Sequence, residues 1–138
     1  MTTKLYQIEN KIEKIRTYLN ILSDFQKYSQ QQITGNLILK GAIERYLYLV
    51  TDSVISLIEM FISIKSFPKP MYYSESVDIL FENKIIDRNQ QKLLHKIIGF
   101  INIMAHDYEK LDYKIVYDVL QNSLTDIFKF CDYIKTKL

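Results

Sequence analysis

The sequence is poor in residues that stop helices or cross-link chains. It has one cysteine, Cys131, two prolines and three glycines in 138 residues. A single cysteine cannot form an internal disulfide, and so few prolines and glycines leave few points at which a helix must end. The length suits one domain that buries roughly two-thirds of its unfolded surface without disulfides or metals. We therefore expect a single domain over residues 1–138.

A strong charge of either sign is also lacking. Lys and Arg together number 18, against 16 Asp and Glu, which gives a net charge of +2. This excess is too small for a long electrostatic footprint on a duplex, so we expect no DNA partner and only local RNA contacts. No N-terminal segment combines basic residues, an apolar core and a small-residue cleavage site, which indicates a cytoplasmic protein.

The longest apolar stretch, residues 37–64, does not have the pattern of a membrane span. A span needs about 18 or more residues with few or no charges. This stretch is interrupted by Lys40, Glu44, Arg45, Asp52 and Glu59. We expect a buried helix here and no membrane partner.

Apolar residues recur at helical spacing throughout the chain. In residues 5–22 they alternate at threes and fours and form a narrow stripe of the kind that joins two helices. The polar run 29–32 ends that helix. Asn36 can cap a second helix that runs to about Lys65, and the prolines at 68 and 70 prevent it from continuing.

Three further helices are expected. Ser74 should cap a short helix that ends near Asn83. Asp87 and Gln90 have the spacing of a capping box, which opens a helix that runs to about His106. Asp112 opens the last helix, whose expected inward residues are Ile115, Val116, Val119, Leu120, Leu124, Ile127, Phe128, Cys131 and Ile134. The pattern predicts an all-α fold, an antiparallel four- to five-helix bundle.

Most catalytic sequence patterns are missing. The chain has no His/Cys cluster, His-Glu-x-x-His pair, glycine-rich phosphate loop or Gly-x-Ser-x-Gly elbow, so we expect neither a metal nor a cofactor. The unusual feature is Asn102 with His106, which are four residues apart and therefore share a helix face. On one interpretation His106 only caps the helix C-terminus, where the helix dipole favours a protonated imidazole, and Asn102 faces solvent. On the other, the pair belongs to a site.

Around this pair the chain reads Ile98-Gly99-Phe100-Ile101-Asn102-Ile103-Met104-Ala105-His106-Asp107-Tyr108. The segment resembles the signature of the HepT group of HEPN-domain toxins, small helical RNases encoded beside a minimal nucleotidyltransferase (MNT) antitoxin. The family pattern is Gly-Phe-Arg-Asn, three residues, His-x-Tyr, then an Asp and an Ile-Val pair. This chain matches it at Gly99, Phe100, Asn102, His106, Tyr108, Asp112, Ile115 and Val116. Residues 42–47 resemble the family's second helix, and Pro70 with Tyr72 resembles its loop.

The resemblance implies a HEPN-like homodimer in which two motif helices form a composite, metal-independent endoribonuclease site. His106 would be the general acid or base for a ribose 2′-hydroxyl, with Asn102 beside it, and the motif Arg would stabilise charge on the phosphate. Here Ile101 occupies the Arg position, and its side chain has no hydrogen-bond donor. Losing such a donor costs other enzymes on the order of 10²- to 10⁵-fold in rate. We therefore expect a weak or inactive RNase.

No other cation is an obvious substitute for the motif Arg. Arg88 and His95 satisfy a loose Arg-x(4 to 6)-His pattern, but Arg88 falls in the first turn of its helix, two turns before the matching stretch. We interpret Arg88 as a solvated surface residue and His95 as partly buried. Lys92 and Lys96 are expected to face solvent.

Tyr108 also has two interpretations. As one of 11 tyrosines it can be a half-buried packing residue. By resemblance it is the tyrosine that the nucleotidyltransferase modifies with AMP, and it shares a face with residue 101 if the helix persists that far. The function is accordingly of one of two kinds. The chain is either the toxin of a type VII-like HepT/MNT toxin-antitoxin pair, impaired by Ile101, or a non-catalytic partner or substrate of the nucleotidyltransferase.

Overall fold

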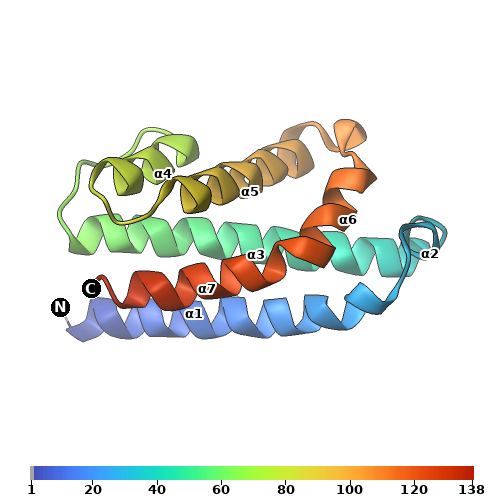
Figure 1. Cartoon of the computed structure of the whole chain (residues 1–138), viewed down its shortest axis with the longest axis horizontal. Coiled ribbons are helices and arrows are strands. Elements are labelled where there is room, and N and C mark those ends of the chain that lie inside the picture. The colour runs from blue at the N-terminus through green and yellow to red at the C-terminus, as the bar shows by residue number, and fades with distance from the viewer. Residues whose placement is uncertain (1) are drawn as a thin grey trace.

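Helices account for all the regular secondary structure in the part of the chain that the structure describes, residues 2–138. The computed structural model contains seven α-helices and two short 3₁₀ helices (Figure 1). In chain order they are α1 (Thr2–Ser23), η1 (Asp24–Lys27), α2 (Gln30–Thr34), α3 (Leu37–Ile64), α4 (Tyr73–Glu82), α5 (Arg88–His106), η2 (Tyr108–Lys110), α6 (Tyr113–Asn122) and α7 (Leu124–Lys135). The prediction of an all-α fold is confirmed.

Four helices, α1, α3, α5 and α7, run along the long axis of the molecule (Figure 1). The chain direction in Figure 1 shows α1 and α5 running one way and α3 and α7 the other. α1 packs against both α3 and α7, and α5 packs on α3 together with the shorter α4. This arrangement is the predicted antiparallel bundle.

α3 is the central helix because it is apolar over most of its circumference. The Asn36 side chain caps it by accepting hydrogen bonds from the amides of Ile38 and Leu39, each at 3.1 Å. Its middle turns are buried, as predicted, and Ile43, Leu57 and Ile58 belong to the hydrophobic core. By length and composition alone α3 could cross a membrane. The core helix of a soluble protein passes the same test, however, and more than half of its most apolar window is buried.

The predicted stripe on α1 faces that core. Ile8, Ile12, Ile15, Leu19 and Leu22 are all buried. They belong to the same hydrophobic cluster as the buried residues of α3, α4, α5, α6 and α7. One continuous core therefore joins the N-terminal helix to the helices that carry the motif.

The expected last helix is in fact two helices, and its predicted continuity is wrong. α6 ends at Asn122 and α7 begins at Leu124, at an angle to it in Figure 1. The break is stabilised from elsewhere in the chain, because the Gln26 side chain donates a 2.8 Å hydrogen bond to the Leu120 carbonyl at the end of α6. Most of the expected inward residues are buried, but Ile115 is exposed.

Two smaller differences concern helix starts. α4 begins at Tyr73 with Tyr72 as its N-cap residue, so the predicted cap at Ser74 is wrong. The polar run 29–32 opens the short helix α2, because Ser29 and Gln32 form a capping box. The capping box of Asp87 with Gln90 and the cap at Asp112 are both confirmed.

Candidate functional site

The candidate site begins with the last two turns of α5. The Asp87–Gln90 capping box fixes where α5 starts, and the helix ends at His106, with Asp107 as its C-cap residue. Asn102 and His106 are both exposed, as their spacing predicts for one solvent-facing side of the helix. Neither side chain hydrogen-bonds to another residue within 2–138, so both are free to contact a ligand or a second protein chain.

Ile101 lies on a different side of α5 from this pair. Its side chain is only 5% exposed and belongs to the hydrophobic core. The position that the sequence resemblance aligns with the motif Arg is therefore filled here by a core residue. A guanidinium at this position would have to extend along the edge of the core to reach solvent.

Tyr108 does not continue the face of residue 101. The helix ends before it, and Tyr108 opens the 3₁₀ turn η2, so the condition for a shared face is not met. Its ring is 48% exposed, and its hydroxyl donates a hydrogen bond to Glu44 Oε1 on α3. Tyr108 therefore lies beside α3, away from the buried Ile101 side chain.

The contact with Glu44 changes the acidity of the phenol. The hydrogen bond to Glu44, followed by desolvation and the negative charge of the same carboxylate, raises the pKa of Tyr108 to about 12. The second oxygen of Glu44, Oε2, is buried and has no hydrogen-bond partner in residues 2–138. The Glu44 carboxylate thus favours the neutral form of the Tyr108 phenol. Within residues 2–138 this carboxylate has no other hydrogen-bond partner.

Arg45, a cation that the sequence analysis did not single out, lies beside Glu44 and Tyr108. Glu44, Arg45, Tyr48, Met104 and Tyr108 line a surface hollow of about 210 Å³. The exposed Arg45 carries its guanidinium carbon 5.9 Å from the centre of the Tyr48 ring. Arg45 is more than 50 residues from the motif in sequence, and only the packing of α5 on α3 brings the two together.

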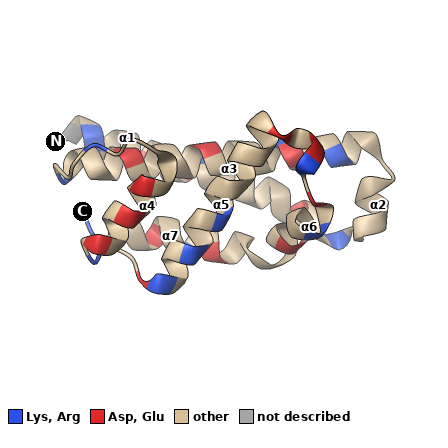
Figure 2. Cartoon of the chain, turned by 90° about the horizontal axis from the view of Figure 1, so that it is seen from above, with Lys and Arg blue, Asp and Glu red and all other residues tan. Residues whose placement is uncertain are grey.

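The four residues considered as alternatives lie as expected. Arg88 is exposed and stacks on Phe81, and His95 is partly buried with Nε2 2.8 Å from Asp78 Oδ1. Lys92 and Lys96 are exposed. Figure 2 shows acidic residues along α4 beside basic residues along α5. The basic residues in the first half of α5 therefore do not form a separate cationic surface.

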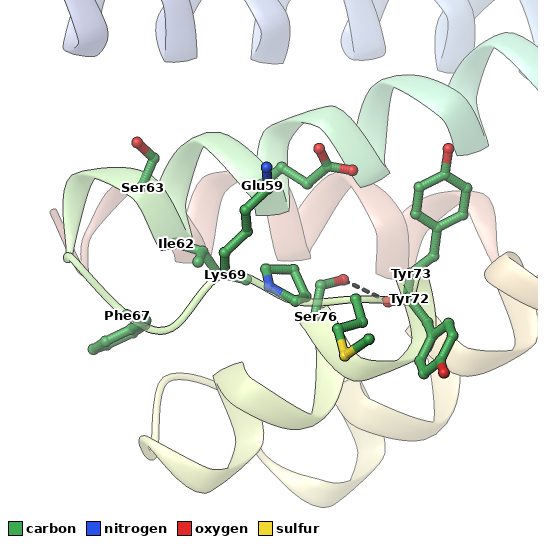
Figure 3. A pocket seen from close by; sticks show the side chains of 10 residues that line it. Glu59, Ile62, Ser63, Phe67, Lys69, Tyr72, Tyr73 and Ser76 are labelled. Atoms are coloured by element: carbon green, nitrogen blue, oxygen red, sulfur yellow. Dashed lines mark hydrogen bonds between the residues drawn. The ribbon is translucent and has the colours of Figure 1, made fainter.

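A cavity lies at the other end of α3. It has a volume of about 520 Å³ and is lined by Glu59, Ile62, Ser63, Phe67, Lys69, Pro70, Met71, Tyr72, Tyr73 and Ser76 (Figure 3). A second hollow of about 440 Å³ is lined by the segment Met71–Ser74 and by Asn102. The loop before α4 therefore borders the exposed face of α5 at Asn102. The exposed Tyr72 and Tyr73 are consequently neighbours of the candidate site.

Comparison with known proteins identifies the family. The model of the HepT-like ribonuclease family matches residues 8–134, nearly the whole chain. The chain belongs to the HepT-like family. This confirms the resemblance inferred from the segment around Asn102 and His106.

Individual relatives agree with this assignment. The mRNA nuclease HepT of Shewanella oneidensis is 35% identical over 68 residues, 49% of this chain and 51% of the relative, so the match spans about half the length of each. A tri-AMPylated HEPN toxin of Shewanella oneidensis, solved in complex with MNT antitoxin, is similar with a TM-score of 0.85 and 26% sequence identity. The alignment covers 94% of this chain and 96% of that toxin chain. A toxin-antitoxin structure with AMP-PNP has a TM-score of 0.85 and 25% identity over 94% of this chain and 97% of the other.

The same fold occurs at lower identity. A cytosolic protein of unknown function from Bacillus subtilis, YutE, has a TM-score of 0.75 and 20% identity, over 94% of this chain and 90% of its own. At that identity the likeness concerns the fold alone.

Proposed function

We propose that this chain is the toxin of a HepT/MNT toxin-antitoxin pair and acts in the cytoplasm as an impaired, metal-independent endoribonuclease. The observation that carries the proposal is that Asn102 and His106 lie free and exposed on one face of α5, within the segment that the HepT-like family model covers. The structural relatives that contain an MNT antitoxin support a nucleotidyltransferase as the partner.

The chemistry follows from the two exposed side chains. His106 removes the proton of a ribose 2′-hydroxyl or protonates the leaving oxygen, and Asn102 donates a hydrogen bond to the phosphate. Neither group supplies a positive charge that is independent of pH. Because Ile101 is buried and apolar, the phosphate lacks the guanidinium that the family motif provides, and cleavage is slow or absent.

The site is completed by a second copy of the chain. One exposed His-Asn pair offers a single proton-transfer group, whereas cleavage of an RNA phosphodiester uses both an acid and a base. A two-fold symmetric homodimer with the two His106 side chains near its axis provides both. The RNA then lies across α5 of both protomers.

A second function is favoured by Tyr108. Its hydroxyl is held against Glu44 at the surface, in a hollow that Arg45 also lines. In this alternative the chain is a non-catalytic partner or substrate of the nucleotidyltransferase, which transfers AMP to Tyr108. A phosphodiester there brings negative charge and bulk beside the α5 end and repels RNA.

RNA cleavage by matched variants tests the proposal. We expect the chain as given to cleave RNA weakly or not at all, and Ile101→Arg to gain activity and to inhibit growth on expression. His106→Ala in the Ile101→Arg background should remove the gain, because no base then remains for the 2′-hydroxyl. Ile103→Arg adds the same charge to α5 at a partly buried position, one of the three residues that the motif leaves unspecified, and is the control, expected not to cleave. Strong cleavage by the Ile101 chain that survives His106→Ala would overturn the proposal.

A further inference from the structure

The contact between Tyr108 and Glu44 joins two segments that are 64 residues apart in sequence. Tyr108 presents about half of its surface to solvent, yet its hydroxyl is directed at a carboxylate in the second turn of α3. Glu44 makes no other hydrogen bond or ion pair with a described residue. A partly exposed tyrosine hydroxyl and a carboxylate that can accept its proton are thus already paired.

We propose that Glu44 is the catalytic proton acceptor when a nucleotidyltransferase transfers AMP from ATP to the Tyr108 hydroxyl. This inference rests on the proposed modification of Tyr108 and assigns the group that makes it possible. The base is then supplied by the protein that is modified, in addition to what the transferring enzyme supplies.

The step balances with ATP as the only co-reactant. The Tyr108 phenolic oxygen forms a bond to the α-phosphorus of ATP, and the bond from that phosphorus to the bridging oxygen of pyrophosphate breaks. Pyrophosphate leaves with the electron pair, and the phenolic proton passes to Glu44 Oε1. The product is a tyrosyl-AMP phosphodiester, and Glu44 later returns its proton to solvent.

A base at this position takes a proton that the phenol keeps at neutral pH. The ordinary pKa of a tyrosine hydroxyl is about 10, and the contact with Glu44 raises the pKa of Tyr108 further, so very little phenolate is available for attack near pH 7. The phenolic oxygen becomes strongly acidic only as its bond to phosphorus forms, and the proton must leave at that moment. Glu44 already accepts the hydrogen bond along which that proton travels.

Arg45 gives the same hollow a positive charge. It follows Glu44 in sequence, lines the hollow at Tyr108, and makes no ion pair with the residues that the structure describes. A planar guanidinium can bind two oxygens of a phosphate at once. Arg45 is therefore placed to neutralise the phosphodiester next to the carboxylate of Glu44, where it would otherwise be repelled.

The first AMP transfer tests this inference most directly. The chain in complex with its cognate nucleotidyltransferase receives Mg²⁺-ATP, and intact-mass spectrometry follows each added AMP with time. Glu44→Gln keeps the side-chain size and an oxygen that accepts the Tyr108 hydrogen bond, but that oxygen takes up no proton at neutral pH. We expect the first transfer to slow by on the order of 10²-fold, the usual effect of removing a general base.

Later transfers provide an internal control. A further AMP that is added to the first one takes a hydroxyl of that AMP as its acceptor, and this is not the phenolic oxygen that Glu44 contacts. Glu44→Gln should therefore leave the second and third transfers at the wild-type rate, whereas a general defect in folding or in complex formation would slow all of them. Glu59→Gln removes the same charge from an exposed position farther along α3 and should behave as the wild type. Glu44→Asp keeps a carboxylate and should retain part of the first-transfer rate.

The outcomes separate the inference from the function on which it rests. Modification of Tyr108 at the wild-type rate in Glu44→Gln would overturn the role of Glu44 and leave the modification intact. Equal slowing of every transfer would also contradict the role as proton acceptor. If the wild-type chain receives no AMP on Tyr108, the proposed modification itself is wrong and the role of Glu44 fails with it. If Glu44→Gln does not fold, Glu44→Asp provides the test: a first-transfer rate below that of the wild type, with normal later transfers, would support the inference, and an unchanged first-transfer rate would contradict it.

Discussion

Ile101 and Asn102 are consecutive residues of α5 that lie in opposite environments, Ile101 in the hydrophobic core and Asn102 in solvent. On the proposed correspondence of position 101 with the motif Arg, a positively charged side chain belongs where this chain has a buried apolar one. Restoring that charge therefore acts on stability as well as on activity, and the two effects have opposite signs.

We expect Ile101→Arg to lower the free energy of unfolding by about 2–3 kcal/mol, because a guanidinium replaces a buried methyl-rich side chain. Ile101→Val, which only removes a methylene, should cost about 1 kcal/mol. Urea unfolding followed by circular dichroism measures both. An Ile101→Arg chain as stable as the wild type would show that position 101 is not part of the core in solution.

Ile101→Lys should restore less RNase activity than Ile101→Arg, because an ammonium binds phosphate as a point charge.

The proposed homodimer can be tested by cross-linking at its axis. The native cysteine, Cys131, is buried, so a single His106→Cys substitution gives one accessible thiol in the described part of the chain. Two such thiols close to a two-fold axis should form a disulfide or accept a short bifunctional cross-linker. Glu59→Cys, which lies roughly 22 Å along α3 from Glu44 at 1.5 Å per residue, should not cross-link. Light scattering that gives a strict monomer at micromolar concentration would contradict both the dimer and the shared RNA site.

The proposed acceptor predicts where AMP attaches. After incubation with the cognate nucleotidyltransferase, ATP and Mg²⁺, peptide mass spectrometry should find one or more AMP units on Tyr108, and Tyr108→Phe should remove them. Tyr113 and Tyr117 are close in sequence but partly buried, and Tyr117 donates its hydroxyl to the Tyr28 carbonyl at 2.9 Å. Adducts on either of these tyrosines instead would show that the wrong acceptor has been assigned.

The Glu44–Tyr108 hydrogen bond should also affect stability at alkaline pH. The pKa of Tyr108 is raised from 10.0 to about 12 in the folded chain, so the stabilisation it provides is complete below pH 10 and is lost as the pH rises through 12. The difference in unfolding free energy between the wild type and Tyr108→Phe should therefore shrink across that range. The effect should be small, because the ring is nearly half exposed and solvent screens the pair. A difference that is independent of pH between 10 and 12 would mean that the hydrogen bond is not made in solution.

Local signals in the sequence predicted much of this fold. The caps at Asn36, Asp87 and Asp112 depend on side chains within three residues of the helix start, and the structure contains all three. The exposed pair Asn102 and His106 follows from a spacing of four on one helix.

The features that sequence spacing did not predict depend on contacts between distant segments. The break at the end of α6 involves Gln26, which is 94 residues from its acceptor Leu120. The hollow that contains Arg45 exists only because α5 packs on α3, and the hydrogen bond from Tyr108 to Glu44 has the same origin. Helical periodicity carries no information about which face of one helix meets which face of another.

Three hydrogen bonds fasten α6 to the turn that follows α1. Gln26 donates to the Leu120 carbonyl, Gln121 donates to the Gln26 carbonyl at 2.8 Å, and Tyr117 donates to the Tyr28 carbonyl. The connection that carries Tyr108 is thereby tethered at both ends, by α5 on one side and by an anchored α6 on the other. A substitution at Gln26 would remove one of the hydrogen bonds that anchor α6 and leave Tyr108 itself unchanged. The position of Tyr108 therefore depends in part on a residue that lies more than 80 positions before it in the sequence.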